Sequence, residues 1–444
     1  MVLSCGLFDS KTSKSHKPSV LFLVSDTTRA DVFIEAETPN VNALADSAYG
    51  QMVDMAIAPS SWTSPSVLSM MTGKSVREHG WDFPIAQVMM KYKMEYAALS
   101  DDTQTLAEVL ADNGFSTQGF IANRFLVRDL GFSRGFDKWE YMTDEELPVR
   151  TLQALEASDA EGSHFFYVHL FGPHQPLRPS RESLKRHSVS RTYLSLAGGM
   201  GHKHMRKSPR HNEVYRMLYQ AVIEETDSRM GTIIDAFLQK FPDGRIIMTS
   251  DHGEMMGEHG EVGHKSGLYQ ELIHVPLVLY GWEQDGQQNG RVGELFSLTA
   301  IPDWITDSIG VEHAWDSQWD EFSSTVKTTP MVVSQRDGDV AAIRSDKKKL
   351  ILDFPMTIQN GHFFQGEPTT HLFDLSIDPK EVNPLLSNEA GQDTEHAAIQ
   401  LELSKELEAW QSARPLGIAD GKTQQTNRAF IEDLRKLGYV SEER

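Results

Sequence analysis

The chain has a single cysteine, Cys5, among its 444 residues. With no second cysteine an internal disulfide is impossible, so a small scaffold held together by disulfides is excluded. A chain of this length can bury a large apolar core without covalent cross-links. Its composition, with 39% hydrophobic and 24% charged residues, is that of an ordinary globular protein.

Long apolar runs and basic charge are also scarce. No apolar run of about 18 or more residues occurs, so we expect no transmembrane helix. The 42 basic residues are outnumbered by 63 acidic ones, which gives a formal net charge of -21. This balance argues against nucleic-acid binding, which calls for a basic surface. A chain this acidic must build a local positive pocket, from a metal or from Lys, Arg and His, to act on an anionic substrate.

The first residues, "MVLSCG", resemble the end of a bacterial lipoprotein signal with Cys5 as the acylated residue. The polar stretch "DSKTSKSHK" that follows reads as a tether, so residues 1–17 are assigned to an N-terminal anchor segment. The charged and apolar regions of a signal are missing. We expect an exported protein, periplasmic or held at the outer membrane only by a lipid on Cys5; a disordered tail with an incidental cysteine is the alternative.

Short apolar runs alternate with amphipathic stretches along residues 18–325. Buried strands are expected at 18–26, 116–123, 164–170, 245–251 and 275–281, and helices at 38–48, 102–114 and 213–240. Alternation of this kind predicts an α/β domain with a large, mixed but mostly parallel sheet sandwiched by helices.

Residues 326–444 read as a small C-terminal α+β subdomain. Two β-rich runs within 329–355 flank Asp337-Gly338, which is a hairpin signal. The tail, 390–436, is charged and is expected to be helical.

Polar residues follow several of the expected strands. Asp26 ends the first strand, Asp251 and His252 end the strand near 250, and His174 comes soon after the 164–170 strand. Open α/β sheets bind ligands at the carboxyl ends of their strands. Carboxylates and imidazoles that converge there suit a divalent metal, although a single Asp at a strand end is more often a loop cap.

Thr63 lies in "SSWTSPSVLSMMTG", just before what reads as a helix. Its hydroxyl can be an N-cap or a nucleophile, and a hydroxyl needs a base or a metal to become nucleophilic. Pro65 suits the first turn of a helix, whose free N–H groups favour an anion in front of Thr63. A metal on Asp26, Asp251 and His252 would also bind the Thr63 oxygen.

Taken together, these segments resemble the sulfatase branch of the alkaline phosphatase superfamily. The resemblance rests on the following stretches, in this order along most of the chain: "LFLVSDTTRAD", "TPNVNALADSA", "SSWTSPSVLSMMTGKSVREHG", "YVHLFGPHQP", "MTSDHGEMMGEHGEVGHKSGLYQELIHVPLVLYG", "HLFDLSIDPKEVNPL" and "DLRKLGYV". It implies the fold class inferred above and a metal-dependent ester hydrolase.

The chain departs from the pattern of this superfamily at four places. Sulfatases have Cys or Ser, converted to formylglycine, where this chain has Thr63, and Arg where it has Val67. Their paired Asp-Asp is Asp26-Thr27 here, and Gly172 stands where two-metal relatives often have Asp. The resemblance therefore implies a Thr-nucleophile variant with one divalent metal (Ca, Mn, Mg or Zn), and it leaves a second metal open.

The resemblance also implies an anion pocket. Substrate-binding residues would be Lys74, His79, His174, His264 and Lys265, and Lys74, His79 and His174 would act in catalysis with Thr63. Considered one at a time, these residues have other interpretations: Lys74 as a solvated helix residue and His79 as a cap of the Gly80 turn.

The leading function is attack by Thr63 on a phosphate mono- or diester or on a sulfate ester, through a covalent intermediate. The substrate would be a small-molecule, glycan or lipid ester. The alternatives are a sulfatase proper, a phosphotransferase to an alcohol, and a degenerate, sulfatase-shaped binding protein. The replacements at Thr27 and Val67 favour the last of these, and retention of Asp26, Asp251 and His252 argues against it.

Overall fold

The structure is a computed structural model of the chain. It describes residues 16–81, 96–126, 130–197, 208–264, 267–282, 290–312, 331–336, 339–344, 347–353, 356–359, 362–365, 369–386, 394–414, 417 and 421–424. Cys5, Lys265, Asp337-Gly338 and the segment "DLRKLGYV" lie outside these ranges. Within them, no helix combines the length and the apolar character that crossing a membrane requires.

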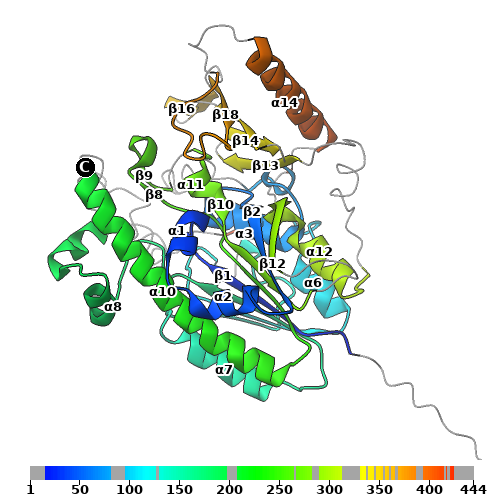
Figure 1. The fold of residues 1–444 in the computed structure, drawn as a ribbon. Coiled ribbons are helices and arrows are strands. Elements are labelled where there is room, and N and C mark those ends of the chain that lie inside the picture. Colours follow the sequence, from blue (N-terminus) through cyan, green and yellow to red (C-terminus); the bar gives the residue numbers. More distant parts are fainter. Residues whose placement is uncertain are drawn as a thin grey trace, which may run out of the picture.

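A nine-stranded sheet forms the centre of the molecule, with the order β10-β2-β11-β7-β1-β6-β4-β5 and β12 paired to β2 (Figure 1). Its strands are β1 (Val20–Ser25), β2 (Gly50–Ile57), β4 (Ser116–Ile121), β5 (Lys138–Tyr141), β6 (His164–Leu170), β7 (Arg245–Thr249), β10 (His274–Val275), β11 (Leu277–Tyr280) and β12 (Gly290–Ser297).

Most of this sheet is parallel. Strand β1 runs parallel to both β6 and β7, β4 runs parallel to β5 and β6, and β12 runs parallel to β2. The β10 and β11 pairings with β2 and β7 are antiparallel. The predicted mixed, mostly parallel sheet is confirmed. Val24 of β1 lies level with His169 of β6 and Thr249 of β7, so the carboxyl ends of these strands meet at one edge.

Both faces of the sheet are buried, which is why its strands are apolar throughout. Phe22 and Val24 of β1 pack into one core, and Leu21 and Leu23 pack into another. The first core is completed by α3 (Thr63–Thr72), α6 (Leu106–Asp112) and α12 (Ile301–Ser308), and the second by α2 (Pro39–Ala45), α7 (Leu147–Ala157) and α10 (Pro209–Lys240) (Figure 1).

Short elements join these layers. They are α1 (Ala30–Glu35), α4 (Val76–His79), β3 (Tyr96–Ala98), α8 (Arg181–Arg186), η2 (Arg191–Ala197), β8 (Met255–Met256), η3 (Glu258–Gly260), β9 (Val262–Gly263), α11 (Gln270–Ile273) and η4 (Leu298–Ala300).

A second, antiparallel sheet has the order β13-β14-β15-β18 and lies beside the first (Figure 1). Its strands are β13 (Met331–Arg336), β14 (Asp339–Arg344), β15 (Lys348–Asp353) and β18 (Thr369–Asp374). Strands β16 (Met356–Gln359) and β17 (His362–Gln365) form a separate two-stranded sheet, and helix α14 (Thr394–Ala413) follows. Arg336 pairs with Asp339, which confirms the hairpin expected between them. The C-terminal antiparallel sheet and its helix are therefore as predicted.

The second sheet is sandwiched in its turn. Ala341 and Ile343 of β14 join the core of the main domain, whereas Ala342 packs with Leu403 and Leu407 of α14. One face of this sheet is thus part of the wall around the main core.

The expectation of a helical tail over 390–436 is wrong for Gly421–Gln424. These residues form strand β19, which pairs antiparallel with β3. A short polar strand of this kind has no apolar periodicity of its own, so its conformation depends on the partner strand.

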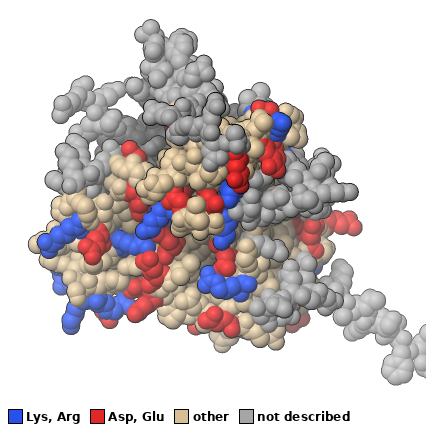
Figure 2. Space-filling model, turned by 45° about the horizontal axis from the view of Figure 1, so that its top comes forward, with Lys and Arg blue, Asp and Glu red and all other residues tan. Residues whose placement is uncertain are grey.

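Basic and acidic side chains lie among one another on the described part of the face that Figure 2 shows. The described part of that face shows no large area in which the charged side chains are all basic or all acidic.

Candidate active site

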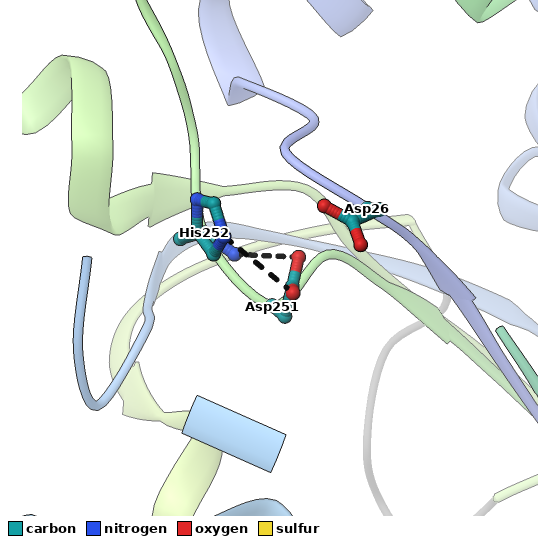
Figure 3. A group of neighbouring side chains, drawn as sticks. All are labelled: Asp26, Asp251 and His252. Atoms are coloured by element: carbon teal, nitrogen blue, oxygen red, sulfur yellow. Dashed lines mark hydrogen bonds and ion pairs between the residues drawn. The ribbon is translucent and has the colours of Figure 1, made fainter. Parts of the chain in front are cut away.

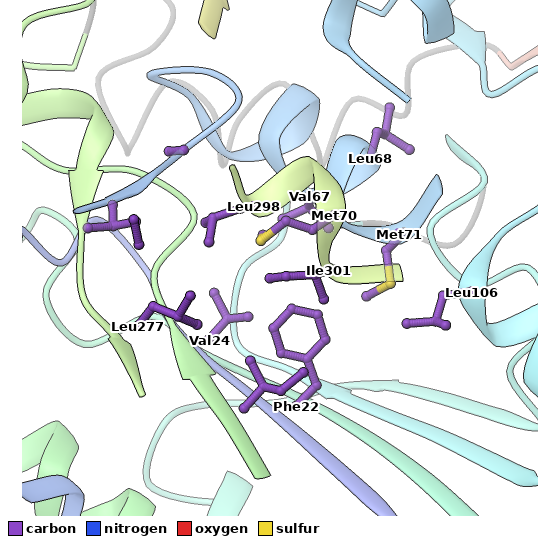
Figure 4. Packing of buried hydrophobic residues seen from close by; sticks show 14 of the residues in the cluster. Phe22, Val24, Val67, Leu68, Met70, Met71, Leu106, Leu277, Leu298 and Ile301 are labelled. Atoms are coloured by element: carbon purple, nitrogen blue, oxygen red, sulfur yellow. The ribbon is translucent and has the colours of Figure 1, made fainter. Parts of the chain in front are cut away.

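Helix α3 begins at Thr63, and every one of its side chains is buried. Val67, Leu68, Met70 and Met71 belong to the same core as Phe22 of β1 (Figure 4). The helix ends at Gly73, whose φ of 68° is readily adopted only by glycine. This packing fixes the first turn of α3 against the carboxyl edge of the sheet.

The Thr63 hydroxyl does not cap the helix. The N-cap residue is Trp62, and Thr63 is the first residue inside the helix. Thr63 Oγ1 lies 3.2 Å from His252 Nε2. In the same turn, Ser66 Oγ accepts from the Ser60 N–H at 3.1 Å and donates to the Ser60 carbonyl at 2.9 Å. The local hydrogen bonds of this turn are therefore made by Ser66, and Thr63 faces the strand ends.

Asp26, Asp251 and His252 come together at those strand ends (Figure 3). Each offers one ligand atom, and these atoms all lie within 4.8 Å of one another. All three residues are fully buried. The structure thus brings the four residues predicted around the metal into one place, with Thr63 on the His252 side.

Two carboxylate oxygen atoms in this cluster have no hydrogen-bond partner among the described residues. Among the described residues, Asp26 Oδ1 and Asp251 Oδ2 are buried without a hydrogen bond, and so is the neighbouring Thr27 Oγ1. Asp251 Oδ1 accepts from the N–H groups of Thr27 and His252, each at 3.0 Å. Unpaired buried carboxylate oxygens are costly, and a cation is the partner that would satisfy them. The donor set therefore fits a divalent metal.

The His252 ring is oriented by its own loop. Its Nδ1 lies 2.8 Å from the Gly253 carbonyl, so Nδ1 carries the proton and Nε2 presents a lone pair. Gly253 itself is packed against α11: a Cβ on it would lie 2.0 Å from the Glu271 carbonyl oxygen. One imidazole with carboxylate oxygens suits Mn²⁺, Mg²⁺, Ca²⁺ or Zn²⁺.

Two residues that sequence reasoning missed hold Asp26 in place. Asn123 Nδ2 donates to Asp26 Oδ2 at 2.5 Å, and His169 Nε2 lies 3.0 Å from the same oxygen. Burial alone would lower the pKa of His169, but the hydrogen bond to Asp26 and the charges of Asp251 and Asp26 raise it above its ordinary value. Both residues sit at the carboxyl ends of β4 and β6, so the strand-end rule that selected Asp26 would have found them.

His174 and His264 lie on the other side of His252. The rings of His252 and His264 are 4.5 Å apart, and those of His264 and His174 are 5.0 Å apart. His264 Nδ1 bonds Glu254 Oε2 at 2.8 Å, and His174 Nδ1 bonds the Gln175 carbonyl at 2.5 Å. Burial lowers the pKa of His174 to about 3, so its ring is neutral in this structure.

Lys74 and His79 follow the far end of α3. Lys74 Nζ donates to Thr103 Oγ1 at 3.2 Å. His79 is engaged at both ring nitrogens: Nε2 lies 3.1 Å from Ser69 Oγ, and Nδ1 accepts from the Trp81 N–H at 3.1 Å. Burial lowers the pKa of His79 to about 3. The contacts of both residues are thus with α3 and its surroundings; Lys265 lies outside the described residues.

A buried cation from the second sheet was also missed. Arg336 of β13 is 1% exposed. Its NH1 group donates to the Ser61 carbonyl at 2.9 Å, to Ser61 Oγ at 3.0 Å and to the His264 carbonyl. Arg336 thus ties the residues before Thr63 to the loop that carries His264, and no local pattern in the sequence indicated this contact.

The sequence has relatives among the arylsulfatases and in the alkaline phosphatase superfamily. It is 36% identical to mouse arylsulfatase K over 98 residues, 22% of this chain and 17% of that protein. It is 27% identical to the multifunctional alkaline phosphatase superfamily protein PehA of Trinickia caryophylli over 227 residues, 44% of this chain and 40% of that protein. These matches cover less than half of the length of either relative.

Solved structures share the fold. A protein in complex with its substrate D-glucosamine-2-N,6-O-disulfate superposes with a TM-score of 0.66 at 18% identity, over 89% of this chain and 98% of that one. The phosphonate monoester hydrolase of Agrobacterium radiobacter gives a TM-score of 0.63 at 17% identity, over 89% and 96%. At these identities the likeness establishes the architecture.

The family is assigned by comparing the sequence with a model of the family. The sequence model of the Sulfatase family matches residues 18–301, a span that contains the main sheet and all the described site residues except Arg336. With this match over more than half of its length, the chain belongs to the Sulfatase family.

Proposed function

We propose that this chain is a metal-dependent ester hydrolase that uses Thr63 as its nucleophile on a phosphate or sulfate ester. The observation that carries the proposal is the position of Thr63 Oγ1, 3.2 Å from His252 Nε2. It lies beside a cluster whose carboxylate oxygens, Asp26 Oδ1 and Asp251 Oδ2, have no hydrogen-bond partner in the described chain.

The metal would be held by Asp26, Asp251 and His252, next to Thr63. A divalent cation there would supply positive charge that favours the ionised hydroxyl and neutralises the non-bridging oxygens of the ester. Asn123 and His169 keep Asp26 oriented through their bonds to Oδ2, which leaves Oδ1 turned away from both. The remaining steps of the reaction are made by side chains of the protein.

Thr63 gives up its hydroxyl proton to solvent and attacks the phosphorus or sulfur atom. The alcohol leaves with the electron pair of the broken ester bond and takes up a proton. The attack is aided by the rigid burial of α3, because a fixed hydroxyl loses no freedom on reaching the reactive geometry. In the protonated form, which a bound anion favours, His174 and His264 would donate from Nε2 to the ester oxygens or to the leaving alcohol, because Nδ1 of each ring is already hydrogen-bonded. Water then cleaves the covalent ester of Thr63 and restores the hydroxyl.

A phosphate ester, mono- or diester, is preferred over a sulfate ester as substrate. Thr63 cannot be converted to formylglycine, and Val67, which is fully buried, stands where that signature has arginine. A sulfate ester remains the second candidate, supported by the family and by the arylsulfatase relatives. Either acid could be attached to a small molecule, a glycan or a lipid; the neighbour bound to a disulfated glucosamine makes a glycan a reasonable first choice.

The proposal is tested with matched 4-nitrophenyl esters of phosphate, methyl phosphate, phenylphosphonate and sulfate, each with Mn²⁺, Mg²⁺, Ca²⁺, Zn²⁺ and chelator. We expect turnover of at least one phosphorus ester, dependent on metal and lost in Thr63→Ala. Added glycerol separates transfer from hydrolysis, because a transferase forms the glycerol ester in place of free phosphate. No turnover and no bound metal would instead favour the binding-protein alternative.

A further inference from the structure

A cavity of about 340 Å³ opens beside the site, with His174 in its wall. We propose that this cavity binds the alcohol part of the ester and selects alcohols that carry an additional anionic group, such as a carboxylate, sulfate or phosphate. The inference rests on the proposed function in one respect only: it takes the ester group to bind on the side of His174 that faces His264.

The cavity is connected to the strand ends that form the site. Its wall includes Ala122, next to Asn123, and Phe171 and Gly172, which follow β6. The Phe171 ring stacks on His174 at 4.4 Å, and the Phe171 N–H donates to Asp144 Oδ1 at 2.8 Å. A group bound in the cavity therefore lies against the same His174 that faces His264.

Three arginines line the cavity: Arg124, Arg178 and Arg229. Arg178 is exposed to it and makes no hydrogen bond or ion pair with any residue that the structure describes. Arg229 reaches Glu145 at 3.8 Å, beyond hydrogen-bond distance, and the Glu145 side chain is itself 76% exposed. Arg124 is fixed by its bond from Nε to Tyr141 Oη at 2.8 Å.

Three carboxylates also line the cavity: Asp144 and Glu225 accept hydrogen bonds, and Glu145 lies across from Arg229 at 3.8 Å. Glu225 accepts from the Ser180 N–H at 2.8 Å and from the Ser183 hydroxyl. Asp144 Oδ1 accepts from the Phe171 N–H, and burial raises the pKa of this carboxyl to about 6. The charged group of the wall that has no partner among the described residues is therefore a donor, the guanidinium of Arg178, and anionic oxygens are the acceptors that match it.

The volume sets the size of the occupant. A cavity of about 340 Å³ is at the lower end of the ligand-site range, about 300–1,000 Å³, so it suits one ring with a charged substituent. In a chain with a net charge of -21, a cavity whose wall holds an unpaired arginine, Arg178, is stronger evidence for an anion site than it would be on a basic protein.

The test compares two esters of whichever acid the enzyme cleaves, the 4-nitrophenyl ester and its 3-carboxy-4-nitrophenyl analogue. The ratio of their kcat/KM values cancels the effect of a variant on chemistry. We expect Arg178→Gln to lower the carboxylated-to-plain ratio about fivefold, and Arg178→Gln with Arg229→Gln to lower it about tenfold or more. Arg186→Gln makes the same charge change on α8, outside the cavity, and should leave the ratio unchanged.

A binding measurement keeps this inference separate from the proposed function. Calorimetric titration with 3-sulfobenzoate and with benzenesulfonate needs no turnover. We expect 3-sulfobenzoate to bind the wild type more tightly, and the double variant to lose that difference. Equal affinity of the wild type for both probes, no binding of either, or a ratio that the double variant leaves unchanged would each overturn the cavity assignment, whether or not any ester is hydrolysed.

Discussion

Thr63 and Ser66 lie in the same turn of α3, but their hydroxyls have different surroundings. Ser66 Oγ closes the loop onto Ser60, and Thr63 Oγ1 lies against His252 Nε2. A hydroxyl that makes local bonds contributes about 1 kcal/mol to stability, and one that attacks substrate contributes to rate. At the scale of single residues, this difference is the basis for assigning the nucleophile.

Thr63→Ala should therefore fold and lose several orders of magnitude in kcat, because no hydroxyl remains to attack. Thr63→Ser should keep part of the activity, since it retains the hydroxyl and loses the methyl group that restricts its rotamer. Ser66→Ala is the matched control: about 1–2 kcal/mol less stable, with kcat within a few-fold of wild type. A Thr63→Ala enzyme as active as Ser66→Ala would move the nucleophile elsewhere.

His79 and His174 should make stability depend on pH. Burial lowers the pKa of each to about 3, whereas an unfolded histidine titrates near its ordinary value of about 6.5. Between these values the unfolded chain binds protons that the native protein does not. The free energy of unfolding should therefore fall as pH drops below about 6.5, by about 1.4 kcal/mol per pH unit for each histidine.

Chemical denaturation at several pH values measures this slope. His79→Gln removes one titrating group, so its free energy of unfolding should fall less steeply with acid than that of wild type. Equal slopes for the two proteins between pH 4 and 6.5 would show that His79 is not held neutral.

Single residues of the site differ in how far sequence predicts them. Asp26 and Asp251 directly follow apolar strands, so their common edge could be inferred. Asn123 and His169 obey the same rule but were overlooked, because an Asn or His at a strand end carries no charge pattern. Arg336 could not be inferred at all, since its contact with Ser61 joins residues that are far apart in the chain.

At the scale of elements, strand β13 supports the segment that leads into α3. The Gln335 N–H donates to the Pro59 carbonyl at 2.9 Å, and Ser334 Oγ donates to the Ala58 carbonyl at 2.6 Å. Arg336 adds its bonds to Ser61 and to the His264 carbonyl. The second sheet thus holds the loop that leads into Thr63, although it lies outside residues 18–301, which the Sulfatase family model matches.

Arg336→Met should lower kcat more than it changes KM, because the loop before Thr63 loses its anchor. It should also cost about 2–4 kcal/mol of stability, since buried carbonyl oxygens lose their donor. Lys348→Met is the control: Lys348 is in the same sheet, in a partly exposed ion pair with Asp374 at 2.7 Å. We expect its kcat to be that of wild type; equal kcat in both variants would reject the role of Arg336.

The buried pair Lys349–Glu381 supports α11 in a similar way. Their side chains are fully buried with Nζ and Oε1 2.6 Å apart, and Glu381 Oε2 accepts from the Gln270 N–H at 2.6 Å. Burial lowers the pKa of Lys349 and raises that of Glu381, so each relies on its partner to stay charged.

Lys349→Met should destabilise the protein by about 3–5 kcal/mol, because it leaves the buried Glu381 carboxylate without a positive partner. Adding Glu381→Gln should recover most of that loss, since the amide oxygen still accepts from Gln270 and no charge remains. Urea titrations of the wild type, both single variants and the double variant give the coupling. Additive effects of the two substitutions would contradict a paired role.

The positions of the main strands could be predicted from the sequence more easily than the pairing between distant strands. The apolar runs of β1, β4, β6 and β7 stand out because both faces of these strands are buried. Strand β19, within the expected helical tail, pairs with β3 more than 300 residues away in sequence. Such pairing is set by the folded molecule, so no local pattern announces it.

For the whole molecule, the two sheets share one core, so the metal site, the loop that leads into Thr63 and the second sheet should unfold together. The buried oxygens of Asp26 and Asp251 that have no hydrogen-bond partner predict that chelator lowers the melting temperature and that added metal restores it. A ligand about 100-fold above its Kd adds about 2.7 kcal/mol. Asp251→Asn should melt at the same temperature with and without chelator; a chelator shift as large as that of wild type would remove Asp251 from the metal site.

The central claim is that Thr63 becomes covalently attached to the phosphoryl or sulfuryl group during turnover. The direct test is to quench the metal-loaded enzyme in acid during turnover of its best 4-nitrophenyl ester, and to map the modified peptide by mass spectrometry. We predict one added phosphoryl or sulfuryl group on Thr63. This group should be absent from the Thr63→Ala variant and from enzyme whose metal a chelator has removed. An adduct on Ser64, Ser66 or another residue while Thr63 stays unmodified would contradict the account.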